Sequence, residues 1–269
     1  MMASSGFTTF EIKKEGGIDW LTLNRPASLN AATAAMCHEL RTYFEDLRRD
    51  PSVRVVVMRG AGRAFCAGLD LKESQQMDAG QGVEFMMQRQ RDTADAILAM
   101  RRAPQPVIGL IHGAAAGSGF AFAMACDVRY AGKSARMTVA VTKMGLSGCD
   151  MGMSYHLTRA VGMSNASEIM MSGRFVDAGR ALRIGLVSEV FEDAELEAAG
   201  RALAEDMLAM TPFGLRLTKD AINHAIDANS IEAAMAMEDR QQILCTATGE
   251  FNEAVAAFME KRKPVYGKK

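Results

Sequence analysis

The sequence predicts an α/β protein whose strands pair mostly in parallel, followed by a region made only of helices. Strand-like and helix-like patterns alternate along the first two-thirds of the chain, which is typical of strand–helix–strand units. After about Phe191 only helical periodicity remains. We therefore divide the 269 residues into a core over residues 1–192 and a helical region over residues 193–269. This length can bury a large core without cross-links.

The core begins with a strand, and helices separate this strand from the next two. Short runs rich in Val, Ile and Leu predict buried strands, and apolar residues spaced three and four apart predict amphipathic helices. A polar segment, Lys72–Gln81, precedes the second helix, and Pro104 and Pro106 end that helix. The expected elements are strands over Ile18–Asn24, Val53–Arg59 and Val107–Ile111 and helices over Ala31–Arg49 and Val83–Arg102.

Four helices are expected in the C-terminal region. Pro212 suits the first turn of one of them, where the missing N–H of proline is tolerated. Their apolar faces, which include Ala233, Met237 and Ile243, must be covered by the core or by another subunit. The four helices are expected over Asp193–Met210, Pro212–Asn229, Ile231–Ala247 and Glu250–Lys263.

Composition argues against several classes of function. The net charge of -1, from 31 basic and 32 acidic residues, gives no reason to expect nucleic acid or a membrane surface as a partner. The five cysteines show no metal-ligand spacing, so we expect no metal site and a reducing, cytoplasmic location. The N-terminus lacks the pattern of a secretory signal. His112, Ser118 and glycines interrupt the apolar run Val107–Cys126, which favours a buried strand and helix over a membrane span.

Two stretches of small residues carry the chemistry. Arg63–Asp70 reads RAFCAGLD, and Ile111–Asp127 reads IHGAAAGSGFAFAMACD. In both, a strand-like apolar run ends in small residues, where the backbone can approach a ligand closely and leave N–H groups free to bind an oxyanion. A helix expected over Gly119–Cys126 would add the field of its N-terminus. Together the two stretches predict an oxyanion hole.

These motifs resemble the paired signatures of the enoyl-CoA hydratase/isomerase (crotonase) superfamily, and the resemblance covers roughly residues 10–266. It implies a crotonase-like spiral of ββα units, the fold shared with ClpP, and a C-terminal region that builds a homotrimer or a dimer of trimers. It also implies an acyl-CoA thioester substrate and no separate cofactor, because coenzyme A is part of the substrate. By residue-to-residue match, the amides of Ala67 and Ser118 would bind the thioester oxygen.

Acid and base residues distinguish this chain from the hydratases of that family. Those enzymes hold and activate water with two glutamates, whereas this chain has Ala121 and Val141 at the matching positions. Asp150 lies close to where dienoyl-CoA isomerases and ring-epoxide phenylacetyl-CoA isomerases carry a catalytic aspartate, although the loop before it is one residue longer. We predict that Asp150 is the catalytic acid and base. The alternative is that it caps a helix that begins near Met151.

The same resemblance assigns further residues to coenzyme A. Arg25 and Lys72 would reach its phosphates, and Phe258 and Lys261 would touch the nucleotide of a bound or neighbouring ligand. Ordinary surface charges and a packed aromatic side chain are the alternative for these four. The other positions assigned to the acyl-CoA site are Ala67, Gly68, Asp70 and Gly117. We expect the side chain of Asp70 to tie down its turn.

Several other residues in these motifs are interpreted without a chemical role. His112, Asp127 and Arg159 are expected to be structural. Ser118 resembles the serine of a hydrolase, but a nucleophile elbow requires glycine two residues away on each side. Here those positions are Ala116 and Phe120, so the elbow motif fails.

The sequence therefore favours an acyl-CoA enzyme that moves a double bond. One carboxylate can remove a proton from an enolate carbon and return it to another, so a single aspartate is sufficient. Three alternatives stay open: an enoyl-CoA hydratase with other acid and base residues, an acyl-CoA hydrolase, and a non-catalytic acyl-CoA-binding protein.

Overall fold

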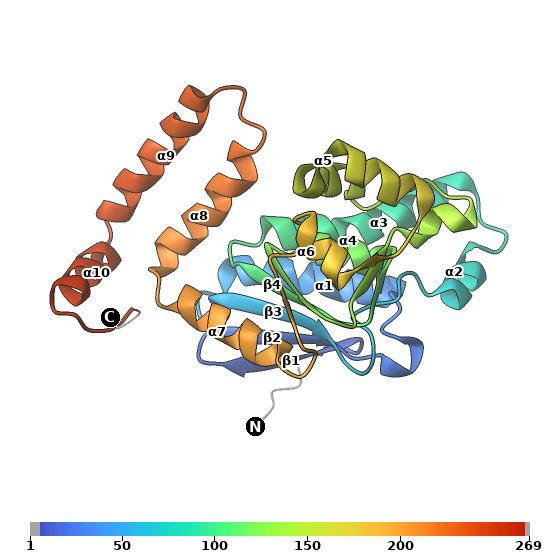
Figure 1. The fold of residues 1–269 in the computed structure, drawn as a ribbon, viewed down its shortest axis with the longest axis horizontal. Coiled ribbons are helices and arrows are strands. Elements are labelled where there is room, and N and C mark those ends of the chain that lie inside the picture. The colour runs from blue at the N-terminus through green and yellow to red at the C-terminus, as the bar shows by residue number, and fades with distance from the viewer. Residues whose placement is uncertain (1–5, 267–269) are drawn as a thin grey trace.

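The computed structural model describes residues 6–266 and is built around two β-sheets (Figure 1). The strands are β1 (Phe10–Glu15), β2 (Ile18–Leu23), β3 (Val55–Gly60), β4 (Val107–Ile111), β5 (Ala114–Ala116), β6 (Val128–Gly132), β7 (Arg136–Thr138), β8 (Val176–Asp177) and β9 (Glu189–Phe191). The larger sheet has the order β1-β2-β3-β4-β6-β9, and the smaller sheet has the order β5-β7-β8. In the larger sheet only the β1–β2 pair is antiparallel, which confirms the mostly parallel pairing predicted from the sequence.

Helices follow most of the strands, as the alternating sequence pattern predicts. They are α1 (Ala34–Asp46), α2 (Leu71–Asp78), α3 (Val83–Arg102), α4 (Ser118–Ala125), α5 (Met153–Ser172), α6 (Ala178–Arg183), α7 (Leu196–Leu208), α8 (Pro212–Ala225), α9 (Ile231–Thr246) and α10 (Gly249–Met259). A 3-10 helix, η3 (Ala140–Met144), leads from the small sheet toward α5. Among residues 6–266, no helix combines the length and the apolar composition needed to cross a membrane.

Apolar side chains on both faces of the larger sheet explain why helices cover both faces. Leu21 and Met58 belong to a buried cluster that includes residues of α1, α3 and α4. Trp20 and Val57, their neighbours along the same strands, belong to a second cluster with α7. Because successive side chains in a strand point to opposite faces, both sets can be apolar at once. The sheet is therefore a buried layer that fixes the strand ends from which the site is built.

The helix α7 begins after residue 192, where the sequence predicts that the core ends. Its helical pattern predicts that it belongs with the C-terminal helices, but Leu196 and Ala204 are buried against the larger sheet. The core therefore extends through α7, because this helix covers a sheet face that would otherwise be exposed.

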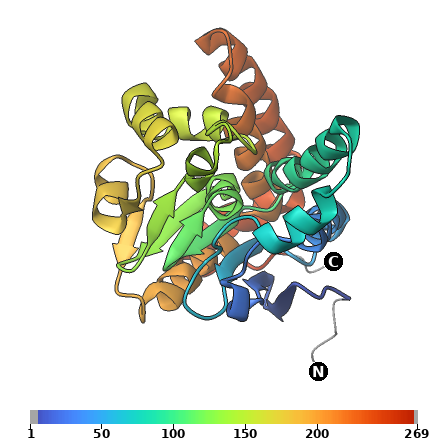
Figure 2. The same cartoon turned by 90° about the vertical axis from the view of Figure 1, so that its right-hand side faces the viewer.

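The last three helices form an arm, residues 212–259, that extends away from both sheets (Figures 1 and 2). None of the sixteen residues of α9 is buried. The arm is tied to the core through Lys219, whose ammonium group lies 2.8 Å from the carbonyl oxygen of Gln105 and 2.8 Å from a carboxylate oxygen of Asp127. Its large exposed apolar side chains are Ile222, Ile226, Ile231, Met235, Ile243, Leu244, Phe251, Val255, Phe258 and Met259.

Most predicted elements begin and end within a few residues of the observed ones. The helix Val83–Arg102 and the strand Val107–Ile111 match residue for residue. The strands β1, β5, β6, β7, β8 and β9 were not predicted. Of these, β5, β7, β8 and β9 have only two or three residues, which are too few to show periodicity. The polar segment Lys72–Gln81 contains most of α2, and α5 begins at Met153 rather than near Met151.

Candidate active site

The two motifs meet at the edge of the smaller sheet. Cys66 pairs in parallel with Ala115 of β5 through an isolated bridge. The amide of Cys66 donates to the carbonyl oxygen of Ala114 at 3.0 Å, and the amide of Ala116 donates to the carbonyl oxygen of Cys66 at 3.0 Å. The chain then turns away from this bridge on both sides. We call residues 66–69 and 115–118 the paired turns.

On the first paired turn the amides of Gly68 and Leu69 donate to no oxygen among the described residues, and Gly68 contacts the thiol of Cys66, whereas on the second turn the amide of Ser118 is free. Leu69 lies three residues after Cys66, and Ser118 lies three residues after Ala115, so the two residues have equal offsets from the bridge. Neither amide donates to an acceptor among the described residues, whereas their neighbours Asp70 and Gly117 donate to carbonyl oxygens. Two free N–H groups on adjoining turns are the arrangement that binds a developing oxyanion.

The amide predicted as the donor of the first motif, that of Ala67, is not free. The amide of Ala67 donates to the carbonyl oxygen of Leu29 at 3.0 Å, so this N–H is already used. Leu69, two residues further on, has a free amide instead. Small side chains identified the turn in the sequence, but they could not show which of its amides pairs with a neighbouring segment.

Glycines make the close approach of the paired turns possible. A Cβ atom added at Gly68, where φ is +103°, would lie 2.8 Å from the carbonyl oxygen of Ala116. A Cβ atom added at Gly119 would lie 2.1 Å from the carbonyl oxygen of Cys66. Gly117 has φ +49° and precedes the helix α4. Larger residues at these positions would force the turns apart, since such contacts are shorter than van der Waals separation.

Ser118 contributes a free amide because it is the first residue of α4. The first amides of a helix have no partner within that helix, and the helix dipole makes this end favourable for negative charge. The hydroxyl group of Ser118 makes no hydrogen bond to any residue in the described part of the chain, so it has no general base. Burial raises the pKa of the neighbouring Cys66 thiol to about 12, which leaves this thiol protonated and unreactive. Neither side chain is therefore set up as a nucleophile.

Apolar side chains occupy the two positions that the sequence resemblance matches to the glutamates of hydratases. Ala121 lies one helical turn after Gly117 and is 2% exposed. Val141 is 8% exposed, and a Cβ atom added at Gly117 would lie 3.6 Å from its Cγ1. These side chains form an apolar wall beside the paired turns and cannot transfer protons.

Asp150 lies in the segment that joins η3 to α5, residues 145–152, which we call the Asp150 loop. It does not cap α5, because the N-cap residue is Gly152 and no side chain accepts a hydrogen bond there. Instead, Oδ1 of Asp150 accepts a hydrogen bond of 2.6 Å from the side-chain amide of Gln90 in α3. The loop is held in an uncommon conformation, since Met151 is buried and has φ +46°. The capping alternative is therefore wrong.

Comparison with known proteins identifies the family of this chain. The model of the enoyl-CoA hydratase/isomerase family matches residues 13–269. The chain belongs to this family. It is 39% identical over 250 residues to a protein of Mycobacterium bovis named as a probable enoyl-CoA hydratase, with 91% of this chain and 88% of the relative covered.

Two further matches extend the comparison to an isomerase and to a solved structure. The chain is 32% identical over 252 residues to the 1,2-epoxyphenylacetyl-CoA isomerase of Escherichia coli, covering 94% of this chain and 95% of the relative. It is similar to the crystal structure of enoyl-CoA hydratase from Bacillus anthracis, with a TM-score of 0.90 and 30% identity over 96% of this chain and 99% of the other. The crotonase fold predicted from the sequence is confirmed.

The two basic residues assigned to coenzyme A, Arg25 and Lys72, have different surroundings. A guanidinium nitrogen of Arg25 lies 3.0 Å from a carboxylate oxygen of Asp70, so this arginine already has a partner. This hydrogen bond is the main cause that lowers the pKa of Asp70, which also caps α2 by accepting from the amide of Glu73. The pair ties down the turn after Leu69, as expected for Asp70. Lys72 is exposed in the first turn of α2 and forms no ion pair within residues 6–266.

The two C-terminal residues assigned to coenzyme A lie on the arm. Phe258 is 82% exposed on α10, and Lys261 follows that helix with φ +53°. In Figure 1, α10 and α2 lie at opposite ends of the molecule. These two residues are therefore not near the paired turns of their own chain.

Three residues interpreted as structural have structural contacts. Nε2 of His112 lies 3.0 Å from the carbonyl oxygen of Gly62. Asp127 accepts from Arg101 at 2.7 Å and from the amide of Val107 at 2.8 Å. Arg159 lies over the ring of Tyr155 at 3.5 Å from its centroid and binds Asp227. These contacts agree with the interpretation of the three residues as structural.

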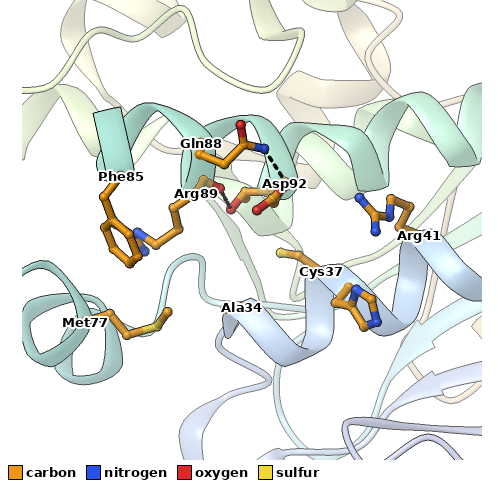
Figure 3. A pocket seen from close by; sticks show the side chains of 10 residues that line it. Ala34, Cys37, Arg41, Met77, Phe85, Gln88, Arg89 and Asp92 are labelled. Atoms are coloured by element: carbon orange, nitrogen blue, oxygen red, sulfur yellow. Dashed lines mark hydrogen bonds between the residues drawn. The ribbon is translucent and has the colours of Figure 1, made fainter. Parts of the chain in front are cut away.

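Two cavities lie beside the elements that carry the site. One, of about 300 Å³, lies between α1, α2 and α3 and is lined by Cys37, Met77, Phe85 and Arg89 among others (Figure 3). The other, of about 1030 Å³, separates the arm from α3 and α5. Neither of these two cavities is lined by Leu69 or Ser118.

Proposed function

We propose that this chain is an enoyl-CoA isomerase that moves a double bond along an acyl-CoA thioester. In this proposal the amides of Leu69 and Ser118 bind the thioester oxygen, and Asp150 carries the proton. The observation that carries it is the pair of free amides at equal offsets from the Cys66–Ala115 bridge, with no acid at the two glutamate positions.

The proposed reaction balances with one carboxylate and no cofactor. The carboxylate of Asp150 accepts a proton from C2 of a 3-enoyl thioester, and the electron pair of that C–H bond moves toward the thioester oxygen. The enolate oxygen is held by the two amides, each of which can contribute about 3–4 kcal/mol of transition-state stabilisation. When the enolate collapses, C2 and C3 become the double bond and C4 receives the proton from Asp150.

Hydration is the second candidate, because relatives carry hydratase names. The addition of water across a double bond requires groups that hold and activate the water, and two glutamates do so in the family's hydratases. Ala121 and Val141 cannot replace them. The comparison of hydration with isomerisation by one purified protein therefore discriminates between the two candidates.

Replacement of Asp150 tests the proposed reaction most directly. Asp150→Asn keeps the size of the side chain but removes its basicity, so isomerisation of a 3-enoyl-CoA should fall about hundredfold to ten-thousandfold. Asp92→Asn, which changes an exposed aspartate bound to Gln88, is the matched control and should keep full activity. The assay follows conversion of 3-enoyl-CoA to 2-enoyl-CoA and hydration of crotonyl-CoA in parallel. Full activity of Asp150→Asn, or hydration faster than isomerisation in the wild type, would reject the isomerase proposal.

The remaining assignments to coenzyme A are part of the same proposal. Lys72 is exposed without an ion pair among the described residues, which supports a phosphate contact. Gly68 and Gly117 would let the thioester approach the backbone. Arg25 would act mainly through Asp70, because the two form an ion pair.

We also propose that the chain works as a homotrimer or a dimer of trimers in the cytoplasm. The exposed apolar side chains of the arm, such as Ile243 at 69%, need a partner surface. Another subunit would bring Phe258 and Lys261 to the nucleotide of its bound ligand. All five cysteines are free, which supports a reducing compartment. Light scattering should report a mass of at least three chains, and a stable monomer of 29.1 kDa would contradict the trimer.

A further inference from the structure

Gln90 makes a contact with Asp150 that no sequence motif indicated. Its side-chain nitrogen lies 2.6 Å from Oδ1 of Asp150, and the two residues are sixty positions apart in the chain. An ionised carboxylate only accepts hydrogen bonds, so the amide nitrogen of Gln90 must be the donor. The contact therefore joins the middle of α3 to the Asp150 loop.

No other side chain in the described part of the protein bonds to the carboxylate of Asp150. Its remaining oxygen, Oδ2, has no hydrogen-bond donor there, and Asp150 forms no salt bridge with any residue within 6–266. The backbone of the loop is fixed by the hydrogen bond from the amide of Met153 to the carbonyl oxygen of Asp150 at 2.8 Å. Gln90 thus fixes the orientation of a side chain whose backbone is already held.

The neighbouring residue connects the same helix to the paired turns. Arg89 binds Asp78 at 2.6 Å and the hydroxyl group of Ser74 at 3.1 Å, and both partners belong to α2. The helix α2 begins at Leu71, directly after Leu69 and Asp70. Arg89 of α3 therefore contacts α2, the helix that follows the free amide of Leu69. The next residue, Gln90, contacts the carboxylate of Asp150, which would carry the proton.

We propose that Gln90 is a positioning residue for Asp150. It holds Oδ1 and leaves Oδ2 to exchange the proton with the substrate, while its own N–H is neither gained nor lost. This inference rests on the proposed function, because it assigns Gln90 a role only if Asp150 transfers the proton. A carboxylate that rotates freely would spend less time aligned with C2 and C4, and misplacement of a reacting group by about 1 Å can cost about hundredfold in rate.

The test compares Gln90 with a nearby glutamine on the same helix. Gln88 is exposed, and its amide donates to Asp92 within α3 at 3.0 Å, as the dashed line in Figure 3 marks. We expect Gln90→Leu to lower kcat for isomerisation about tenfold to hundredfold while KM stays within about twofold. Gln88→Leu should leave both constants within about twofold of the wild type. Gln90→His, which can donate from a ring nitrogen, should recover part of the lost kcat.

A double-mutant cycle separates failure of this inference from failure of the proposed function. In the Asp150→Asn background, Gln90→Leu should cause no further loss, because the side chain it positions no longer transfers a proton. If Asp150→Asn is inactive but Gln90→Leu matches Gln88→Leu, the positioning role is wrong and the proposed function stands. A rise in KM at unchanged kcat in Gln90→Leu would also overturn the positioning role, since Gln90 would then contribute to binding alone. If Asp150→Asn is fully active, the proposed function itself is wrong.

Discussion

The paired turns and the Asp150 loop are the two halves of the candidate active site, and they are built from different parts of the chain. The paired turns use backbone amides, and most of their residues, such as Cys66 and Ser118, are buried. The Asp150 loop uses a side chain, and its carboxylate is held by one exposed glutamine. A backbone donor survives almost any side-chain replacement, whereas a catalytic carboxylate is lost by a single one. Under the proposed function, oxyanion binding would therefore be fixed by the fold and the reaction type by a few replaceable side chains.

Among changes to the paired turns, removal of one backbone donor should lower the activity most. Proline is tolerated at the first position of a helix, so Ser118→Pro deletes the N–H at the start of α4 while the helix can still form. Isomerisation should fall about hundredfold to thousandfold. Ser118→Ala keeps the amide and should stay within about twofold of the wild type in kcat, because the hydroxyl group has no assigned role.

Steady-state kinetics and circular dichroism check this prediction together. A native-like Ser118→Pro protein with full activity would show that this amide does not bind the substrate oxygen. A large loss in Ser118→Ala would instead assign a role to the hydroxyl group, and the distinction between backbone and side-chain halves would fail.

Separation of the paired turns should lower kcat by a smaller factor. Gly68→Ala places a methyl group 2.8 Å from the carbonyl oxygen of Ala116, so the turns must move apart and the two amides lose their common target. We expect kcat to fall about tenfold to hundredfold. Gly16→Ala is the matched control, because Gly16 also has positive φ, +56°, but no atom lies within 4 Å of the added Cβ.

Both glycine variants should lose some stability, since alanine is strained at positive φ. Thermal unfolding measures that shared loss, and the kinetic assay measures the loss specific to Gly68. Equal activity of the two variants would mean that the spacing of the paired turns does not matter for catalysis.

The smallest expected effect is a pH dependence of the free energy of unfolding, caused by His156 near the Asp150 loop. His156 lies in the first turn of α5, and burial is the main cause that lowers its pKa from 6.5 to about 4. The folded state therefore favours the neutral imidazole, and the unfolded state binds the extra proton as the pH falls from 6.5 to 4. The contribution of the neutral His156 to the free energy of unfolding should be fully present above pH 6.5 and decrease toward pH 4. Because the imidazole is only partly buried, we expect a loss of about 1–2 kcal/mol.

Unfolding in denaturant at several pH values checks this window. His156→Gln should flatten the dependence between pH 4 and pH 6.5, and His224→Gln, a change at an exposed position, should leave it unchanged. An unaltered slope in His156→Gln would assign the pH dependence to other groups.

The sequence by itself determined the fold class, most of the elements and the place of the site. Buried strands and amphipathic helices have periods that depend on local sequence, so Val83–Arg102 and Val107–Ile111 were predicted to the residue. The small residues around Gly68 and Gly117 marked the turns, because only such residues allow two backbones to meet so closely. The motifs also identified the family to which the chain belongs.

Only the tertiary structure decided which backbone amides in those turns are free and which side chain holds the carboxylate of Asp150. The local pattern does not show which amides of the turn are paired, and the hydrogen bond from the amide of Ala67 to Leu29 in another segment shows that this one is used. The contact between Gln90 and Asp150 spans sixty residues and leaves no local signal. The arm after α7 likewise has ordinary helical periodicity, yet it extends from the core. Periodicity reports that a face is apolar, but which surface covers it depends on contacts between distant parts of the chain or between chains.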